Sequence, residues 1–267
     1  MPGSKHTQPA ADSTGRPDEV VKARTVHEHL WPAVDVPLTE FPHADAMRSA
    51  VEACALPGGS LSYFAVSALQ PGYGFRFFLE TNAGHSQPSG AAQDRRLWVE
   101  WIAYDASGKE IRRMGVVDDG ALEEPEGEHR ECMFRDRLKD ANDNEVHMFW
   151  EAASYESNLL LGAPKDLMLN SGNHTRRCDY RPFFSEPPAR IDLRVRIRPM
   201  GMDVLQSLVQ SQHLAPEVAA RMPTFTLASY EITYDQSVQD YLIRDTTPAD
   251  CNAYVCALNP DDADCQH

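Results

Sequence analysis

LWVEWIAY, residues 97–104, carries apolar side chains on both faces of an extended chain. A run of this kind is typical of a strand in the middle of a sheet, where both faces are covered. We therefore expect a central strand here, with Trp98 or Trp101 in the core of the protein. The turn residues DASG, 105–108, follow directly and lead into a second strand over residues 110–117.

Further segments with a period of two lie on either side of this strand in the sequence. They cover residues 61–69, 73–81, 133–138, 145–153, 190–198 and 225–234. Three short helices are predicted at 44–55, about 203–212 and 216–221. Many short strands separated by turn residues indicate a mostly-β protein, and we expect an antiparallel β-sandwich (Ig-like) with a few short helices.

The alternation is cleanest over residues 190–198, which read RIDLRVRIR. The apolar side chains of this strand should face the core: Ile191, Leu193, Val195 and Ile197. The others are expected on a solvated face: Arg190, Asp192, Arg194, Arg196 and Arg198.

Three regions follow from these patterns. Residues 1–57 form an extended N-terminal segment with one short helix, 58–235 form the sandwich, and 236–267 form a cysteine-containing tail. Residues 1–43 have no hydrophobic period, so we expect them to pack poorly on the sandwich.

The excess of acidic residues limits which partners the chain can bind. With 25 Lys+Arg against 40 Asp+Glu, the formal net charge is −15, which repels phosphate backbones and anionic lipid. No apolar run approaches the roughly 20 residues of a membrane span. The expected partners therefore include neither nucleic acid nor the membrane interior, whereas a basic protein or a cation remains compatible.

The cysteines indicate an oxidising compartment. Three of the six, Cys251, Cys256 and Cys265, lie in the polar tail, where free thiols would be exposed to oxidation. Residues 1–24 nevertheless lack the apolar core of a secretory signal. Both observations are satisfied if the chain is the rear part of a longer exported protein, in the periplasm or otherwise outside the cytoplasm.

Catalytic motifs are missing from the sequence. It contains no GxSxG, no glycine-rich phosphate loop with its lysine and no CxxC. The oxygen-rich stretches 123–128 and 140–144 could each surround calcium, but a solvated loop and a hairpin turn explain them better. His27-Glu28-His29 is a weak metal pattern by itself. We expect no enzyme activity from this chain alone.

One segment resembles a known family. Residues 82–111, NAGHSQPSGAAQDRRLWVEWIAYDASGKEI, resemble the GH-x-x-P-[ST]-G, L-x-V and D-x-x-G signature of C-terminal haem-free β-domains in bacterial multihaem c-type cytochromes. MFRDRL at 133–138, FWEA at 149–152 and the strand at 193–199 match the later part of that domain. The resemblance covers roughly residues 24–235. In this family a haem motif often reads CxxCHMP. The chain opens with Met1-Pro2, which is similar to the MP that follows the haem-binding histidine.

The resemblance implies a role in electron transfer that depends on haem carried elsewhere. The chain has no CxxCH, so it cannot hold haem c covalently, and haem c is expected in the parent or a neighbouring region. The implied partner is a haem-bearing N-terminal region or a cytochrome subunit, which this domain would cap. The resemblance points to His85, His29 and His27 as candidate cofactor-binding residues, with His85 and His29 foremost as distal ligands of haem iron.

Two other functions remain open. An extracytoplasmic β-sandwich that binds protein or sugar, without a redox role, would carry exposed aromatic residues clustered on one sheet face. A metal-dependent enzyme would bring His27, His29 and His85 together around copper or zinc.

Overall fold

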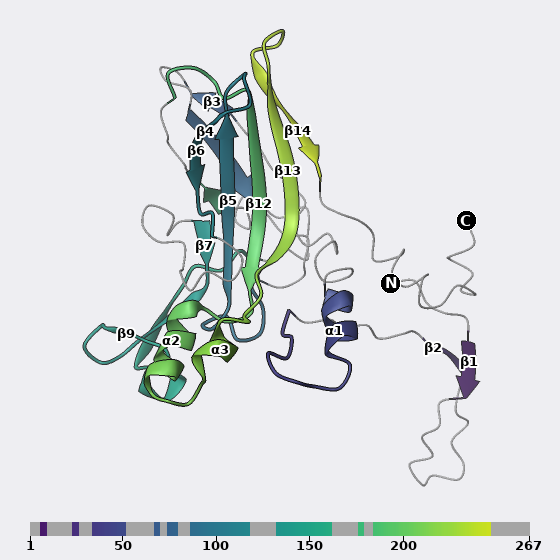
Figure 1. Cartoon of the computed structure of the whole chain (residues 1–267), viewed down its shortest axis with the longest axis vertical. Helices are drawn as coiled ribbons and strands as arrows, with labels where there is room; N and C mark the ends of the chain where they lie inside the picture. Colours follow the sequence, from purple (N-terminus) through teal and green to yellow (C-terminus); the bar gives the residue numbers. More distant parts are fainter. Residues whose placement is uncertain are drawn as a thin grey trace.

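The computed structural model describes residues 6–9, 23–26, 34–51, 67–69, 74–79, 86–117, 132–161, 176–178 and 184–246. Its centre is a six-stranded antiparallel sheet in the order β14-β13-β12-β5-β6, with β7 also paired to β5 (Figure 1). These strands are β5 (Arg96–Tyr104), β6 (Glu110–Met114), β7 (Met133–Phe134), β12 (Arg190–Arg198), β13 (Phe225–Asp235) and β14 (Asp240–Asp245). The predicted mostly-β, antiparallel class is confirmed.

β5 lies in the middle of this sheet, as its two apolar faces predict. It pairs with β12 along its whole length, from Arg96 opposite Arg198 to Tyr104 opposite Arg190. Its other edge is shared by β7 near Leu97 and by β6 near Trp101. Both tryptophans are buried, Trp101 on the core face and Trp98 on the opposite face. Covering both faces removes large apolar surfaces from water, which favours a central position.

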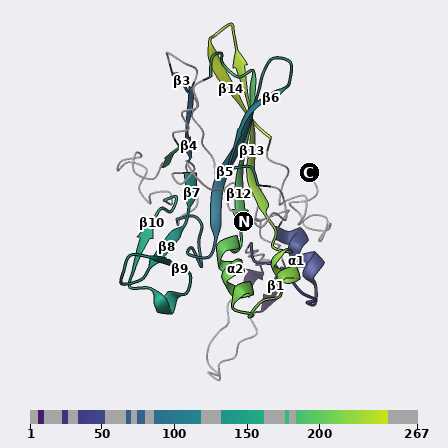
Figure 2. The ribbon, with the colours of Figure 1, turned by 60° about the vertical axis from the view of Figure 1, so that its left-hand side comes forward.

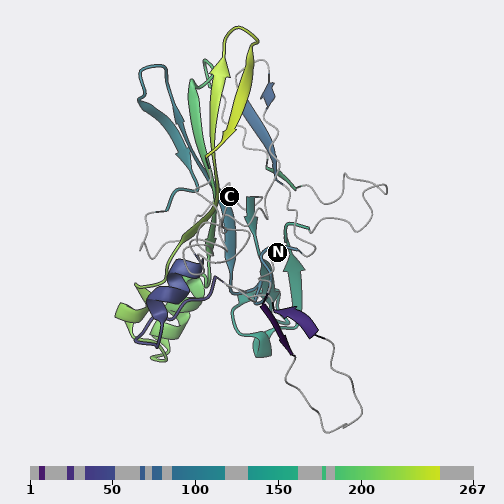
Figure 3. The ribbon, with the colours of Figure 1, turned by 90° about the vertical axis from the view of Figure 1, so that its right-hand side faces the viewer.

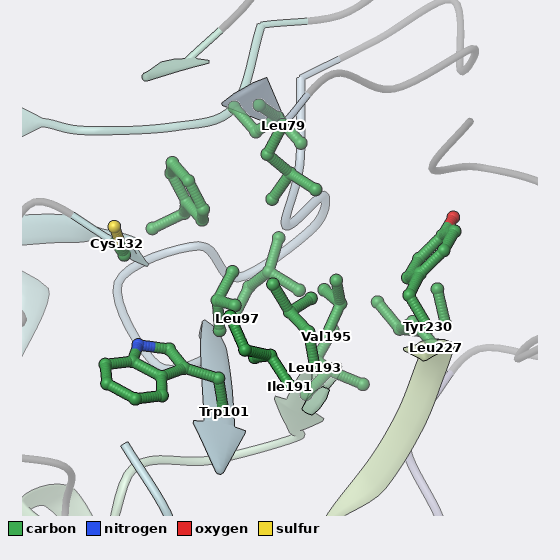
Figure 4. Close-up of a cluster of buried hydrophobic side chains, with 14 of the residues drawn as sticks. Leu79, Leu97, Trp101, Cys132, Ile191, Leu193, Val195, Leu227 and Tyr230 are labelled. Carbon is green, nitrogen blue, oxygen red and sulfur yellow. The ribbon is translucent and has the colours of Figure 1, made fainter. Parts of the chain in front are cut away.

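A smaller sheet lies against the core face and makes the fold sandwich-like (Figure 2). It consists of β3 (Ser67–Leu69), β4 (Gly74–Leu79) and β11 (Arg176–Cys178), in the order β11-β4-β3. Figure 4 shows Leu79 pointing from this sheet toward Leu97 and Val195 of the large sheet. The inward apolar side chains predicted for residues 190–198 are all buried in this core.

The helices lie at one end of the large sheet, opposite the β13–β14 turn (Figures 1 and 3). They are α1 (Ala44–Ala50), α2 (Met202–Gln210) and α3 (Pro216–Ala219). α2 and α3 form a second small core from Met202, Leu205, Ala219 and Met222, against which Leu38 packs. None of the helices in the described ranges is long and apolar enough to cross a bilayer.

Two further sheets complete the described structure. β8 (Asp136–Lys139) pairs with both β9 (Glu145–Val146) and β10 (Ser154–Ser157). β1 (His6–Pro9) pairs with β2 (Ala23–Val26).

Three sequence-based expectations need correction. The strand predicted over 145–153 stops at Val146, because the backbone turns through the 3-10 helix η3 (Phe149–Glu151) so that β10 can return beside β8. The large sheet continues beyond residue 235 into β14, where Tyr241 is buried against Tyr234. Val34 belongs to the core, so the expected poor packing of residues 1–43 is wrong at that position.

Candidate functional site

The three candidate ligand histidines, His27, His29 and His85, lie outside the described residues. The structure does describe the second half of the motif loop, from Ser86 onward. We call residues 86–95 the motif segment. Its geometry bears on His85 because His85 is bonded directly to its first residue.

The motif segment is fixed to the core by a backbone bridge. The amide of Gln87 donates to the carbonyl of Leu160 at 2.7 Å, and the amide of Leu160 donates back to Gln87 at 2.9 Å. Leu160 is fully buried, and Pro88, which follows a cis peptide bond, is buried as well. A reciprocal pair of hydrogen bonds to a core residue holds the backbone two residues after His85 in place.

Gly90 and Arg95 close the other side of the segment. Gly90 has φ +77°, and a Cβ there would lie 2.9 Å from the Arg95 guanidinium. The position therefore needs glycine both for its backbone conformation and for space. The Arg95 guanidinium donates to the carbonyl of Ser89 and pairs with Asp35 at 2.5 Å. This contact ties the motif segment to residues that precede α1.

A buried ionic cluster anchors the start of β5, directly after the motif segment. Arg96, whose side chain is 1% exposed, donates to both carboxylate oxygens of Asp203 at 2.7 and 2.8 Å. Arg135 also contacts Asp203, at 3.3 Å, and it pairs with Glu145. Asp203 is the second residue of α2. The cluster therefore joins β5 of the six-stranded sheet, β9 of the small sheet formed by β8, β9 and β10, and α2.

The charges of this cluster set the pKa values of its carboxylates. Burial by itself would raise the pKa of Asp203, but Arg96 and Arg135 together hold it below its usual value. At nearby Asp94, burial outweighs the attraction of Arg96 and raises the pKa. Asp203 is thus maintained as an anion between two arginines. Gly201 makes room for this arrangement, because a Cβ at that position would collide with the Arg96 and Asp203 side chains.

The expected solvated face of β12 is wrong at its C-terminal end. Arg196 and Arg198 are buried, and they donate to Thr226 Oγ1 at 2.8 Å and to Thr224 Oγ1 at 3.0 Å. The Arg198 guanidinium also lies 5.8 Å from the centre of the Trp98 ring. α2 begins soon after β12 and lies at the same end of the sheet (Figure 1).

The other end of this face contains a hollow of about 510 Å³. Its lining includes Glu100, Asp192, Arg194 and Glu231, with Tyr104 at one side. These charges have partners on the sheet. Arg194 pairs with Glu100 of the neighbouring β5, Arg190 with Asp192 within β12 at 3.1 Å, and Arg244 of β14 with Glu231 of β13 at 2.8 Å. Within the described ranges, His, Cys, Asp and Glu side chains form no group of three that could hold a metal ion.

An exposed aromatic pair lies beside the β8–β10 sheet. Phe149 is 72% exposed and Trp150 is 69% exposed, and their rings meet edge to face with centroids 5.0 Å apart. Tyr155, on β10, is also exposed. Sequence reasoning placed Phe149 and Trp150 within a strand and missed their exposure, because apolar residues in a strand pattern are usually taken as core.

The described part of the chain also includes one cysteine side chain, that of Cys132. It is buried beside Phe134 at the core, and it is disulfide-bonded. Cys251, Cys256 and Cys265 lie outside the described residues, so the disulfide predicted for the tail stays a prediction.

Comparison with known proteins gave one similar solved structure. No protein-family model and no curated protein matches the chain. The chain is similar to a penta-heme cytochrome c552 from Thermochromatium tepidum, with 19% sequence identity and a TM-score of 0.48. The match covers 66% of this chain and 40% of that one, so this chain corresponds to less than half of the cytochrome's length.

Proposed function

We propose that this chain is a non-catalytic β-domain of a multihaem c-type cytochrome. It caps the haem-bearing region and donates a distal histidine to one haem. The haem supplies the electron-transfer chemistry, and this chain supplies ligation, shielding from water and a fixed geometry. The proposal places the domain in the periplasm or otherwise outside the cytoplasm.

The observation that carries the proposal is the fixed backbone of the motif segment. A distal ligand must hold its imidazole nitrogen at one position, because a ligand on a mobile loop pays an ordering cost whenever it binds iron. Gln87, two residues beyond His85, is bridged to buried Leu160, and Arg95 holds Ser89 from the other side. In the motif GH-x-x-P-[ST]-G, these contacts fix the residues that follow the histidine.

The chemistry of the sequence agrees with haem supplied by a partner. A histidine with a neutral imidazole can ligate iron, whereas covalent attachment needs the two thiols of CxxCH, which this sequence lacks. His85 is therefore the proposed ligand, with His29 and His27 as further candidates. The partner is the haem-bearing N-terminal region of the same polypeptide or a separate cytochrome subunit.

The test is His85→Ala in the haem-bearing protein, with His213→Ala as the matched control. His213 is exposed just beyond the end of α2, and its hydrogen bonds in the described structure are local: its ring contacts Ser211 Oγ at 2.9 Å and its amide donates to the carbonyl of Leu208 at 2.9 Å. We expect His85→Ala to convert one low-spin haem to high-spin in absorption and EPR spectra, with unchanged far-UV circular dichroism. Unchanged haem spectra together with a lowered unfolding temperature would instead make His85 a structural residue and overturn the proposal.

A second candidate function rests on the aromatic pair. Phe149 and Trp150 lie on η3 and not on the sheet face expected for this alternative, but an exposed aromatic pair is a feature of surfaces that bind another protein. Under this alternative, Trp150→Ser loses the partner that the native protein retains, and that partner contains no haem c. A retained haem c partner in the same experiment favours the cytochrome proposal.

A further inference from the structure

β14 forms one edge of the six-stranded sheet and carries exposed apolar side chains. In the ranges that the structure describes, β13 is the only strand paired with it. Leu242 is 55% exposed, Ile243 is exposed as well, and so is Val238 in the turn before the strand. An edge strand presents unpaired backbone groups, so exposed apolar side chains make it a template for another strand.

The charges of β14 are arranged so that the strand is complementary to itself. Its sequence from Asp240 to Arg244 is DYLIR, with opposite charges at equal distances from Leu242. Asp240, Leu242 and Arg244 share one face, because side chains alternate along a strand. The Arg244 side chain is 69% exposed, and although it pairs with Glu231 at 2.8 Å it has further donors available.

We propose that two copies of this protein associate through antiparallel pairing of their β14 strands, with a two-fold axis at Leu242. In this register Asp240 lies opposite Arg244 of the second copy, and Arg244 lies opposite Asp240. The two Leu242 side chains meet at the axis. The two sheets then form one continuous sheet, which covers the exposed edge of each copy.

Other registers lack this complementarity. An in-register parallel pairing sets Asp240 opposite Asp240 and Arg244 opposite Arg244. An antiparallel pairing shifted to an axis at Ile243 sets Leu242 opposite Arg244 and buries no ion pair. Cross-strand pairs of opposite charge stabilise a sheet and like charges destabilise it, so the axis at Leu242 is favoured. The net charge of −15 opposes association in general, but physiological salt screens charges beyond about 8 Å.

The test uses charge reversal at the two positions. Sedimentation velocity over a concentration series should give a monomer–dimer equilibrium for the native chain. Asp240→Arg and Arg244→Asp each set like charges opposite one another twice per dimer, so each should weaken dimerisation by about tenfold or more. The matched control is Glu217→Arg on α3, an exposed site with the same change in net charge as Asp240→Arg, and it should dimerise like the native chain.

The decisive sample is an equimolar mixture of the two single variants. A variant with arginine at both positions and a variant with aspartate at both positions each repel their own copies but are complementary to each other, whereas the double variant is complementary to itself only in the antiparallel arrangement. We expect the mixture to form heterodimers with near-native affinity, and the double variant to form homodimers again. A native chain that stays monomeric, single variants that dimerise normally, or a mixture that stays monomeric would each overturn the proposal. The inference does not rest on the proposed function.

Discussion

Replacing Asp203 by asparagine removes the carboxylate that Arg96 and Arg135 share. Arg96 is 1% exposed, and it donates two hydrogen bonds to the Asp203 carboxylate. Removing one partner of a buried ion pair costs roughly 3–5 kcal/mol, because the remaining charge stays away from water. Asp203 keeps 30% exposure and Arg135 retains Glu145, so we expect a loss of about 3 kcal/mol, at the low end of that range.

Urea unfolding followed by circular dichroism measures this loss. The midpoint should fall while the slope of the unfolding free energy against urea stays unchanged, since the buried area is the same. Asp143→Asn is the matched control: Asp143 is 79% exposed, pairs with Lys139 on the surface, and has a φ of 66° that asparagine accepts. The control should unfold like the native chain. A loss below about 1 kcal/mol for Asp203→Asn would refute the argument that Arg96 depends on this carboxylate.

Three other predictions concern the same regions. Gly201→Ala places a Cβ 2.5 Å from Arg96 Cζ and closer still to Asp203 Oδ1, so thermal unfolding should show a loss of about 1–3 kcal/mol; an unchanged melting temperature contradicts the close packing. The pKa of Asp203 is lower in the folded state than its usual value of 3.8. The ionised carboxylate therefore contributes its full stabilisation of the fold above pH 3.8, and this contribution is lost as the pH falls through the folded-state pKa. Urea midpoints measured on acidification below pH 3.8 should therefore fall more steeply for the native chain than for Asp203→Asn, and parallel curves would be against this. Trp150→Ser should leave the unfolding free energy unchanged, because Trp150 is 69% exposed; a clear loss would mean that it packs against the protein.

The central strands could be predicted from the sequence because their pattern reflects their surroundings directly. LWVEWIAY has two apolar faces and becomes β5, and RIDLRVRIR alternates and becomes β12 beside it. Periodicity reports which side chains share a face. It does not report what covers that face, where Arg196 and Arg198 are buried and donate to Thr226 of β13 and to Thr224 just before that strand.

Local sequence was also insufficient around Phe149. Residues 145–153 have strand-like composition, but the backbone forms η3 because β10 returns to pair with β8, a contact set by residues distant in the sequence. The candidate histidines depended on the family resemblance, because no spacing of His27, His29 and His85 identifies a haem ligand without the partner that carries the haem. The anchoring of the motif segment by Leu160 and Asp35 could not be read from the sequence, since both contacts join distant segments.

The most direct test of the account is the haem c content of the native protein. The polypeptide or complex that contains this chain would be isolated from its own host, and haem c would be measured by the pyridine haemochrome spectrum against protein mass. The account predicts covalently bound haem c on the same polypeptide or on a tightly bound subunit, in more than one copy. A pure, folded preparation with its native partners and no haem c would contradict it.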